Sequence, residues 1–311
     1  MTITQLEYIV AVDAHRSFVA AANQCFITQP TLSMQIQKLE AELGVRLFDR
    51  KKQPVVPTEI GQEVVEQAHK ILAEHRRIKE IIADRKSEMA GHLRLGIIPT
   101  LAPYLLPLFL VKFLGDNPKV NVSVAELPTQ EILRQLTSNL LDCGLMATPL
   151  HDPSIDETPL FYEPLVAYIS DGSVLAAKTE IVPADIDVNE LLLLTEGHCL
   201  RSQVVNLCDL KANCQPNLKL EYQTGSIETL KRLVEMNHGS TILPELSLIG
   251  LSATDLSRVR RFQHPAPTRE ISLVTHRSFV KKSLIEGFKQ EIIRAVPTKM
   301  LVPQERAGLN L

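Results

Sequence analysis

The chain lacks the excess of positive charge that would by itself indicate binding to nucleic acid. Its 311 residues contain 33 Lys and Arg against 36 Asp and Glu, a net charge of −3. Any case for nucleic acid must therefore come from a local motif rather than from the field of the whole protein. The length suits two or three domains and is ample for a buried core.

The chain also lacks a long uninterrupted apolar run and a recognisable leader. Its most apolar long stretch, LAPYLLPLFLVKFL, is broken by two prolines and a lysine. Such a stretch is a poor membrane span, and the first residues have no basic, apolar and small-residue order typical of a signal peptide. We therefore expect a cytoplasmic protein without a membrane partner, in which the five cysteines stay reduced at rest.

The common catalytic and nucleotide-binding motifs are missing. There is no P-loop, no GxGxxG after a strand, no GxSxG and no HExxH. The carboxylates show no spacing that nominates an acid/base pair, so the sequence indicates no enzyme and implies no cofactor.

Residues 17–44 predict two helices joined by a tight turn. Thr28 is placed to cap the second helix, Pro30 suits its first turn and Gly44 suits its end. Helical spacing predicts that four apolar residues face inward: Leu32, Ile36, Leu39 and Leu43. An amphipathic helical hairpin inside any α domain would show the same pattern. The stretch VRLFDRKKQPVVPT after it predicts a basic wing placed to meet phosphates.

The order AANQCFITQPTLSMQIQKLEAELGVRLFDR followed by PTEIG resembles the winged helix-turn-helix of LysR-type transcriptional regulators. The resemblance implies that residues 1–58 bind operator DNA through the second helix and the wing. The expected contact residues are Gln29, Pro30, Thr31, Ser33, Met34, Gln37, Lys38 and Arg50. Met34 departs from the family, which often has arginine after the LS pair.

Residues 59–90 predict a long helix with an apolar stripe. The stripe runs through Ile60, Val64, Ala68, Ile71, His75, Ile78 and Ile82, at spacings of three and four. A stripe of this kind suits a seam between two helices, or packing of a long helix on its own domain. The resemblance implies a linker helix that pairs subunits.

From residue 91 onward, predicted strands alternate with predicted helices, which indicates an α/β fold with a parallel sheet. The resemblance implies a two-lobed effector domain over residues 91–300, similar to periplasmic binding proteins. Lobe I would contain residues 91–162 and 267–300, lobe II residues 163–266, and residues 301–311 would form a tail.

The stretch GHCLRSQVVNLC places His198 beside Cys199, with Arg201 nearby and Cys208 nine residues on. These neighbours, and a helix beginning near Cys199, would favour the reactive thiolate. Three interpretations remain open from the residues: inert packing, a zinc site with His198 and Cys214 added to the two cysteines, and a redox pair. One straight helix over residues 199–208 would separate the Cα atoms by roughly 13–14 Å, whereas a disulfide tolerates about 7 Å.

The same stretch resembles the core of the peroxide-sensing members of the LysR-type family, as do IPTLAPYLLP, LDCGLMA, SIETLKRLV and GSTILPEL. That resemblance implies that Cys199 reacts with hydrogen peroxide and that Cys208 is its disulfide partner. It also implies a peroxide pocket, for which we expect Thr100, Thr129, His198, Arg201 and Arg269. Cys214 is a departure that would compete for the oxidised sulfur, whereas Cys25 and Cys143 suit packing.

The expected function is thus peroxide-responsive regulation of transcription. The expected partners are operator DNA, hydrogen peroxide, three further copies of the chain in a dimer of dimers, RNA polymerase and thiol reductants. A metabolite-responsive LysR-type regulator with incidental cysteines is the alternative, and a thiol peroxidase is a third reading.

Overall fold

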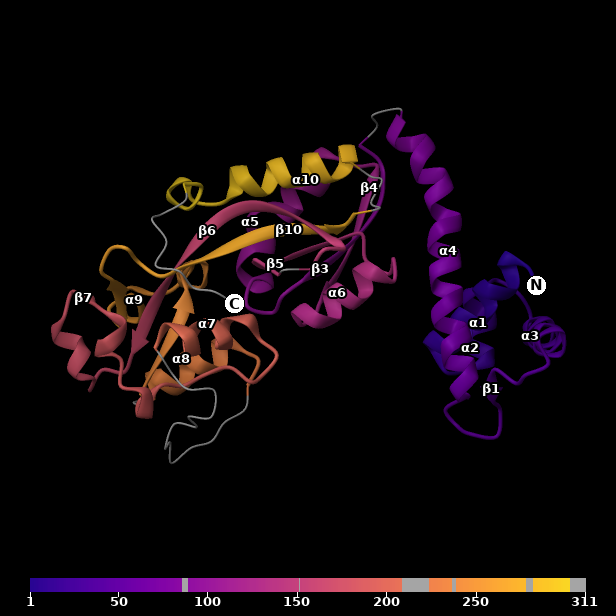
Figure 1. Cartoon of the computed structure of the whole chain (residues 1–311), viewed down its shortest axis with the longest axis horizontal. Coiled ribbons are helices and arrows are strands. Elements are labelled where there is room, and N and C mark those ends of the chain that lie inside the picture. Colours follow the sequence, from indigo (N-terminus) through magenta and orange to yellow (C-terminus); the bar gives the residue numbers. More distant parts are fainter. Residues whose placement is uncertain (86–88, 151, 209–223, 237–238, 278–281, 303–311) are drawn as a thin grey trace. The chain divides into compact units, whose positions relative to one another are not determined.

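The computed structural model describes residues 1–85, 89–150, 152–208, 224–236, 239–277 and 282–302. It divides into two compact units (Figure 1). The first contains residues 1–86 with the short segment 137–140, and the second contains the rest. Among the described residues, no helix is both long and apolar enough to cross a membrane.

The first unit is a small helical domain with a two-stranded wing and a long helix. Its elements are α1 (Ile3–His15), α2 (Phe18–Gln24), α3 (Gln29–Leu43), β1 (Phe48–Asp49), β2 (Val56–Pro57) and α4 (Glu59–Arg85). β1 and β2 pair antiparallel, with Phe48 opposite Pro57. The core takes side chains from α1, α2, α3, the wing and the first part of α4.

The caps predicted for α3 are confirmed. The Thr28 side chain accepts a hydrogen bond from the Thr31 amide, Pro30 lies in the first turn, and Gly44 ends the helix with a φ of 71°. Leu32, Ile36 and Leu39 are fully buried, as their spacing predicts. The prediction for Leu43 is wrong, because that side chain is exposed. Leu43 is the last helical residue, where the chain already turns away from the core into the left-handed Gly44.

The apolar stripe of α4 is used unevenly. Ala68 is buried in the core of the first unit, and Val64 and Ile71 pack against it. Ile78 remains 61% exposed, whereas the side chain of Ile82 lies outside the described residues. The middle of the stripe therefore packs within its own domain, whereas Ile60 at its start is 43% exposed and Ile78 is available to a partner.

The second unit is an α/β domain. Its strands are β3 (Gly91–Ile97), β4 (Val120–Glu126), β5 (Cys143–Thr148), β6 (Ile155–Ile169), β7 (Glu180–Ile181), β8 (Ser240–Pro244), β9 (Val259–Phe262) and β10 (Thr268–His276). Its α-helices are α5 (Ala102–Asp116), α6 (Thr129–Thr137), α7 (Cys199–Leu207), α8 (Ile227–Glu235), α9 (Ala253–Leu256) and α10 (Lys282–Ala295). Short 3-10 turns include η4 (Glu245–Leu248) and η5 (Thr298–Met300). The stretch LKLEYQT (residues 218–224), whose composition predicts a strand, lies almost wholly outside the described residues.

The sheet is mixed, so the prediction of a parallel sheet holds for β3, β4 and β5 and for the short β7–β9 pair only. β3 pairs parallel with both β4 and β5. β10 instead runs antiparallel to both β5 and β6, and β6 runs antiparallel to β8 and β9. The cause is the return of the chain through β6 and β10, which the alternation of strands and helices does not reveal.

β6 joins the two lobes and was not predicted from the sequence. Its first part pairs with β10 as far as Pro164, and from Leu165 onward it pairs with β8 and β9. Pro159 and Pro164 disguise the strand in the sequence, because proline removes a ladder donor. The structure accommodates Pro159 beside a register shift between Ile271 and Ser272 of β10.

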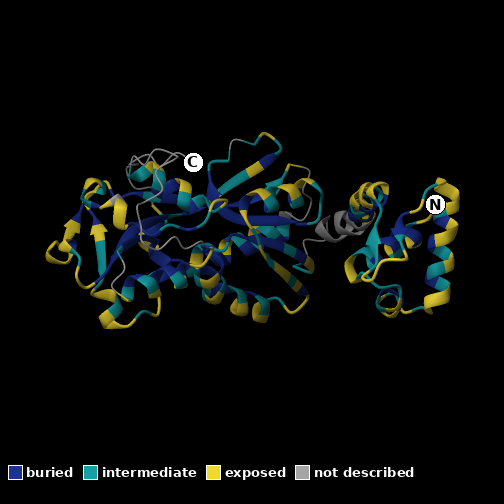
Figure 2. Cartoon of the chain, turned by 90° about the horizontal axis from the view of Figure 1, so that it is seen from below, coloured by how far each residue is buried: buried dark blue, intermediate teal, exposed yellow. Residues whose placement is uncertain are grey.

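Each lobe has its own apolar core. We call the half with β3, β4, β5, α5, α6 and α10 lobe I, and the half with β7, β8, β9, α7 and α8 lobe II. Within this unit the buried residues follow the strands and the inner helix faces, and exposed residues cover the outside (Figure 2). Tyr104 packs against both cores, which places it where the lobes meet.

Candidate functional site

Cys199 is the first residue of α7, and its sulfur contacts a hydroxyl from the other lobe. The Sγ of Cys199 lies 2.6 Å from Oγ1 of Thr129, which is the first residue of α6. Two helices thus begin at this contact, and helix N-termini carry free N–H groups and the positive end of the helix dipole. His198 at the N-cap of α7 makes no side-chain cap bond that would compensate them. The sulfur therefore lies beside the N-termini of two helices that come from different lobes.

Cys208 lies at the opposite end of the same helix. α7 is continuous from Cys199 to Leu207, and Cys208 is its C-cap. Nine steps of about 1.5 Å separate the two Cα atoms by roughly 13–14 Å, about twice what a disulfide tolerates. The two thiols are not bonded to each other in this state. A bond between them requires α7 to unwind.

α7 is held by apolar packing, with one defect. Leu200 and Val204 are buried in the core of lobe II, against which Cys208 also packs, whereas Cys199 packs against the core of lobe I. Gln203 is buried as well, and its Oε1 has no hydrogen-bond partner among the described residues. A buried unpaired acceptor destabilises the state that contains it. Apolar packing thus stabilises the helix, and the unpaired Oε1 of Gln203 destabilises it.

His198 is half-buried beside the reactive position, and burial lowers the pKa of its imidazole. The ring is therefore mainly neutral near pH 7 and offers a hydrogen bond rather than a full charge. A Cβ at Gly225 would lie 2.8 Å from Nε2 of this ring. Gly225 thus permits the close approach, and sequence analysis did not single it out.

His198 also lines an open cleft of about 420 Å³ between the lobes. The other lining residues are Pro99, Pro103, Tyr104 and Glu126 from lobe I, and Thr224, Gly225, Ser226, Ile227 and Glu228 from lobe II. The Tyr104 hydroxyl donates to Oε1 of Glu228 over 2.8 Å, so a hydrogen bond spans the two walls.

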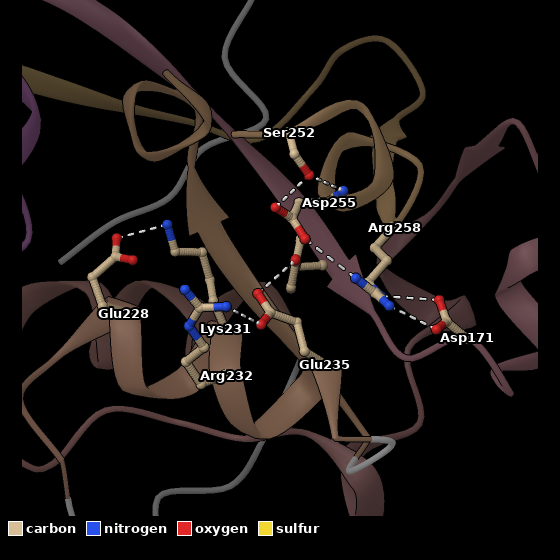
Figure 3. A network of polar contacts seen from close by, with 9 residues as sticks. Asp171, Glu228, Lys231, Arg232, Glu235, Ser252, Asp255 and Arg258 are labelled. Atoms are coloured by element: carbon tan, nitrogen blue, oxygen red, sulfur yellow. Dashed lines mark hydrogen bonds and ion pairs between the residues drawn. The ribbon is translucent and has the colours of Figure 1, made fainter. Parts of the chain in front are cut away.

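A network of ion pairs and hydrogen bonds surrounds α8, which contributes Glu228 to the lobe II wall of this cleft (Figure 3). On α8, Lys231 pairs with Glu228 and Arg232 pairs with Glu235. Glu235 also accepts a hydrogen bond from Tyr168 of β6. Beside them, Arg258 joins Asp171 to Asp255. α8 is therefore tied to the strand that runs through both lobes.

Arg269 and Thr100 lie together in a buried network. The guanidinium donates through Nη1 to Oγ1 of Thr100 over 3.0 Å and pairs with Glu163 at 2.8 Å. Glu163 also accepts the backbone N–H of Leu246. Both charged side chains are fully buried, so Glu163 compensates the positive charge expected from Arg269. Burial raises the pKa of the Glu163 carboxyl, and the guanidinium opposes that shift.

Glu163 was not among the site residues predicted from the sequence, although the sequence carries a signal for it. It is a single carboxylate inside the otherwise apolar stretch LFYEPLVAYI. A buried charge of this kind requires a partner, but the sequence does not say which. The structure places Arg201 differently from Arg269: its guanidinium donates to the carbonyl of Leu194 and so holds the segment that leads into α7. Cys214, the fourth member of the possible zinc set, lies outside the described residues.

The first unit presents a second candidate site on α3. Gln29, Pro30, Met34, Gln37 and Lys38 are exposed, and Thr31 and Ser33 are half-exposed. Arg50 at the end of β1 donates to Oγ of Ser33 over 2.8 Å and pairs with Glu40 at 3.2 Å. Its guanidinium also lies 4.7 Å from the centroid of the Phe18 ring. Arg50 therefore fixes the wing against α3, beyond any contact with a phosphate.

Comparison with known proteins covers both units. Residues 3–62 match the family described as bacterial regulatory helix-turn-helix protein, lysR family, and residues 86–297 match the LysR substrate binding domain. The chain is 35% identical over 274 residues to a hydrogen peroxide-inducible genes activator of Haemophilus influenzae, covering 88% of this chain and 90% of that protein. It is 37% identical over 274 residues to the DNA-binding transcriptional dual regulator OxyR of Escherichia coli, covering 88% and 89%.

A solved structure is similar over nearly the whole chain. Full-length OxyR from Pseudomonas aeruginosa, with a cysteine-to-aspartate substitution, gives a TM-score of 0.76 at 30% identity. The likeness covers 95% of this chain and 99% of that one.

Proposed function

The chain belongs to the LysR family of bacterial regulators, and we propose that it senses hydrogen peroxide through a reversible Cys199–Cys208 disulfide that changes its binding to operator DNA. One observation carries the proposal. Cys199 begins α7 in contact with the Thr129 hydroxyl, and Cys208 ends the same helix. Oxidation of this pair therefore cannot occur without a change of fold.

The chemistry needs only peroxide and two thiols. The thiolate of Cys199 attacks one peroxide oxygen, the O–O bond breaks, and hydroxide leaves with the electron pair of that bond. The resulting sulfenic acid is attacked by the thiolate of Cys208, and its hydroxyl leaves as water after protonation. Both sulfurs are oxidised by one electron each, and one peroxide is reduced to two waters.

We assign the peroxide pocket to Thr129, His198, Thr100, Arg201 and Arg269. The Thr129 hydroxyl already contacts the attacking sulfur, and the neutral imidazole of His198 adjoins it. Thr100 and Arg269 belong to one buried hydrogen-bonded network, which keeps their donors fixed. Arg201 orients the segment before α7. Fixed donors stabilise the hydroxide that leaves during the reaction.

The energy of the disulfide suits a two-state switch. Closing a loop of about ten residues is worth on the order of 3 kcal/mol in the chain-entropy model, which shifts a population by roughly a hundredfold. The packing of Leu200 and Val204 opposes unwinding, and the unpaired Gln203 favours it. A reversible switch requires a free-energy difference of only a few kcal/mol between the helical and the unwound state.

The proposal is tested by peptide mapping with mass spectrometry and by hydrogen exchange, before and after one equivalent of peroxide. We expect a Cys199–Cys208 disulfide and faster exchange across residues 197–208, with a changed DNA footprint. A disulfide elsewhere, or this disulfide with unchanged exchange, would contradict the mechanism. Peroxide consumed in many turnovers would identify a peroxidase instead, and an unaltered footprint would favour a regulator of metabolite response.

The remaining partners follow from this function. We propose that the protein works in the cytoplasm, where thiol reductants return the disulfide to the reduced state, and that it acts on RNA polymerase as a dimer of dimers. We assign the contacts with operator DNA to Gln29, Pro30, Thr31, Ser33, Met34, Gln37, Lys38 and Arg50. Oxidation then serves as a signal once per cycle rather than as catalysis.

The assembly is tested at α4. Ile78 is 61% exposed, and we expect a second subunit to cover it. Ile78→Glu should give smaller species in analytical ultracentrifugation, with weaker DNA binding, because a charge in an apolar seam is costly. Glu66→Gln on the exposed surface of the same helix is the control and should leave the mass unchanged. An unchanged mass for Ile78→Glu would show that this position lies outside any subunit interface.

A further inference from the structure

Phe26 is an unusual residue for the place it occupies. It follows α2 in the turn of the helix-turn-helix, with a φ of 55° and 95% of its surface exposed. Its N–H donates to the carbonyl of Asn23, and the next N–H, from Ile27, donates to the carbonyl of Ala22. These two bonds form a Schellman motif, in which the left-handed position normally belongs to glycine.

The fold therefore gains nothing from a phenylalanine here. A bulky side chain disfavours the left-handed backbone, and a ring that is almost fully exposed gains no burial energy. Both effects act against the residue within its own chain. A contact outside the chain is the remaining physical reason for an aromatic ring at this position.

The position of Phe26 identifies that contact. Phe26 is two residues before Thr28, the N-cap of α3, and two residues span about 7 Å at most. The N-terminal residues of the second helix of a helix-turn-helix meet base edges in the major groove of DNA. The ring thus continues the DNA-reading surface of α3. In the major groove, a phenylalanine ring can make an apolar contact with the C5 methyl group of thymine.

Met34 extends the same apolar surface along α3. It is 59% exposed, and it lies one helical turn after the exposed Pro30. Its thioether side chain offers no donor for a base edge, so it supplies apolar contact instead. We propose that Phe26 and Met34 each read a thymine methyl group in the operator. This inference concerns DNA sequence and does not depend on the thiol chemistry.

The test removes single methyl groups from the DNA. Full-length protein selects an operator from a random pool, and each thymine is then replaced in turn by deoxyuridine, which retains the hydrogen-bonding groups. We expect at least two positions where loss of the methyl weakens binding about fourfold, the value of one buried carbon. Phe26→Gly should abolish sensitivity at one of them, and Met34→Ala at another, as a thermodynamic cycle requires.

The controls separate this contact from a structural role. Phe26→Gly should unfold at a temperature at least as high as the parent, because glycine favours the left-handed backbone, and yet bind DNA more weakly. Phe26→Asn, which also tolerates that backbone, repeats the test with a side chain present. Val19→Ala removes another exposed apolar side chain, on α2, and should leave the deoxyuridine profile unchanged.

Three outcomes overturn the proposal. One is that no thymine is sensitive to loss of its methyl group. Another is that the variants bind more weakly but keep the full deoxyuridine profile, which would place the side chains against sugar or phosphate. The third is that Phe26→Gly changes the mass of the assembly, which would place the ring between subunits.

Discussion

Cys199→Ser is expected to abolish the effect of peroxide on DNA binding, because the hydroxyl cannot form the sulfenic acid that begins the reaction. The variant preserves the size of the side chain and its contact with Thr129 at the start of α7. Reduced protein should therefore bind operator DNA as the parent does, and added peroxide should leave the footprint unchanged. The measurement is a footprint titration with peroxide, accompanied by a count of free thiols.

Cys208→Ser separates the two steps of the reaction. Cys199 should still oxidise, but its partner at the end of α7 is missing. The sulfenic acid should therefore persist, or condense with the thiol of Cys214 to a disulfide with loss of water. Trapping with dimedone and mass spectrometry distinguishes these products. Hydrogen exchange across residues 197–208 should remain slow while sulfenic acid persists, because no bond forces the helix to unwind.

Cys25→Ala provides the matched control. Burial, followed by the charge of Glu7, raises the pKa of the Cys25 thiol, which leaves little of the reactive thiolate at neutral pH. This variant should respond to peroxide as the parent does. A full response in Cys199→Ser would show that the sensing thiol is not Cys199 at the start of α7. A lost response in Cys25→Ala, with folding intact, would contradict the assignment in the same way.

Arg269→Met is expected to destabilise the effector domain by about 3–5 kcal/mol, the typical result of removing one partner from a buried ion pair. The change leaves Glu163 fully buried without its counter-charge and removes the hydrogen bonds to Thr100. Thermal unfolding, with hydrogen exchange of β6 and β10, measures the loss. Arg277→Met, in an exposed pair with Asp156 just after β10, should cost at most about 1 kcal/mol.

The loss in Arg269→Met should also depend on pH. Burial raises the pKa of Glu163, and without the guanidinium only the hydrogen bond from the Leu246 backbone still opposes that shift. A raised carboxyl pKa means that the folded state favours the protonated form. The contribution of the protonated carboxyl to the free energy of unfolding is therefore fully present below the pKa of the unfolded state, and it is lost as pH rises through the pKa of the folded state. The deficit should therefore be smaller near pH 4 than near pH 7. Glu163→Gln in the same background should remove this pH dependence, and a deficit that is constant with pH would contradict the explanation.

The helices at both candidate sites could be predicted from sequence because their signals are local. Thr28, Pro30 and Gly44 mark the ends of α3 within a few residues of the backbone groups they satisfy. The stretch from Cys199 to Cys208 likewise suits a helix, and its length alone requires unwinding before a disulfide forms. The choice of thiols and the DNA-binding role came from resemblance to a family, since composition and charge point to neither.

Contacts between distant residues were decided only by the tertiary structure. Thr129 lies against Cys199 across 70 positions of sequence, and Arg269 pairs with Glu163 across 106, because β6 runs through both lobes and β10 pairs beside its first part. The resemblance grouped Thr129 and Arg269 in one pocket with Cys199, but it gave neither the contact of Thr129 with Cys199 nor the pairing of Arg269 with Glu163. The prolines of β6 also hid the strand that carries Glu163. Local caps and periodicity act within one element, whereas the partner of a buried charge depends on how strands far apart in the sequence align. That alignment is a property of the packed core, and it exists only once the whole sheet has formed.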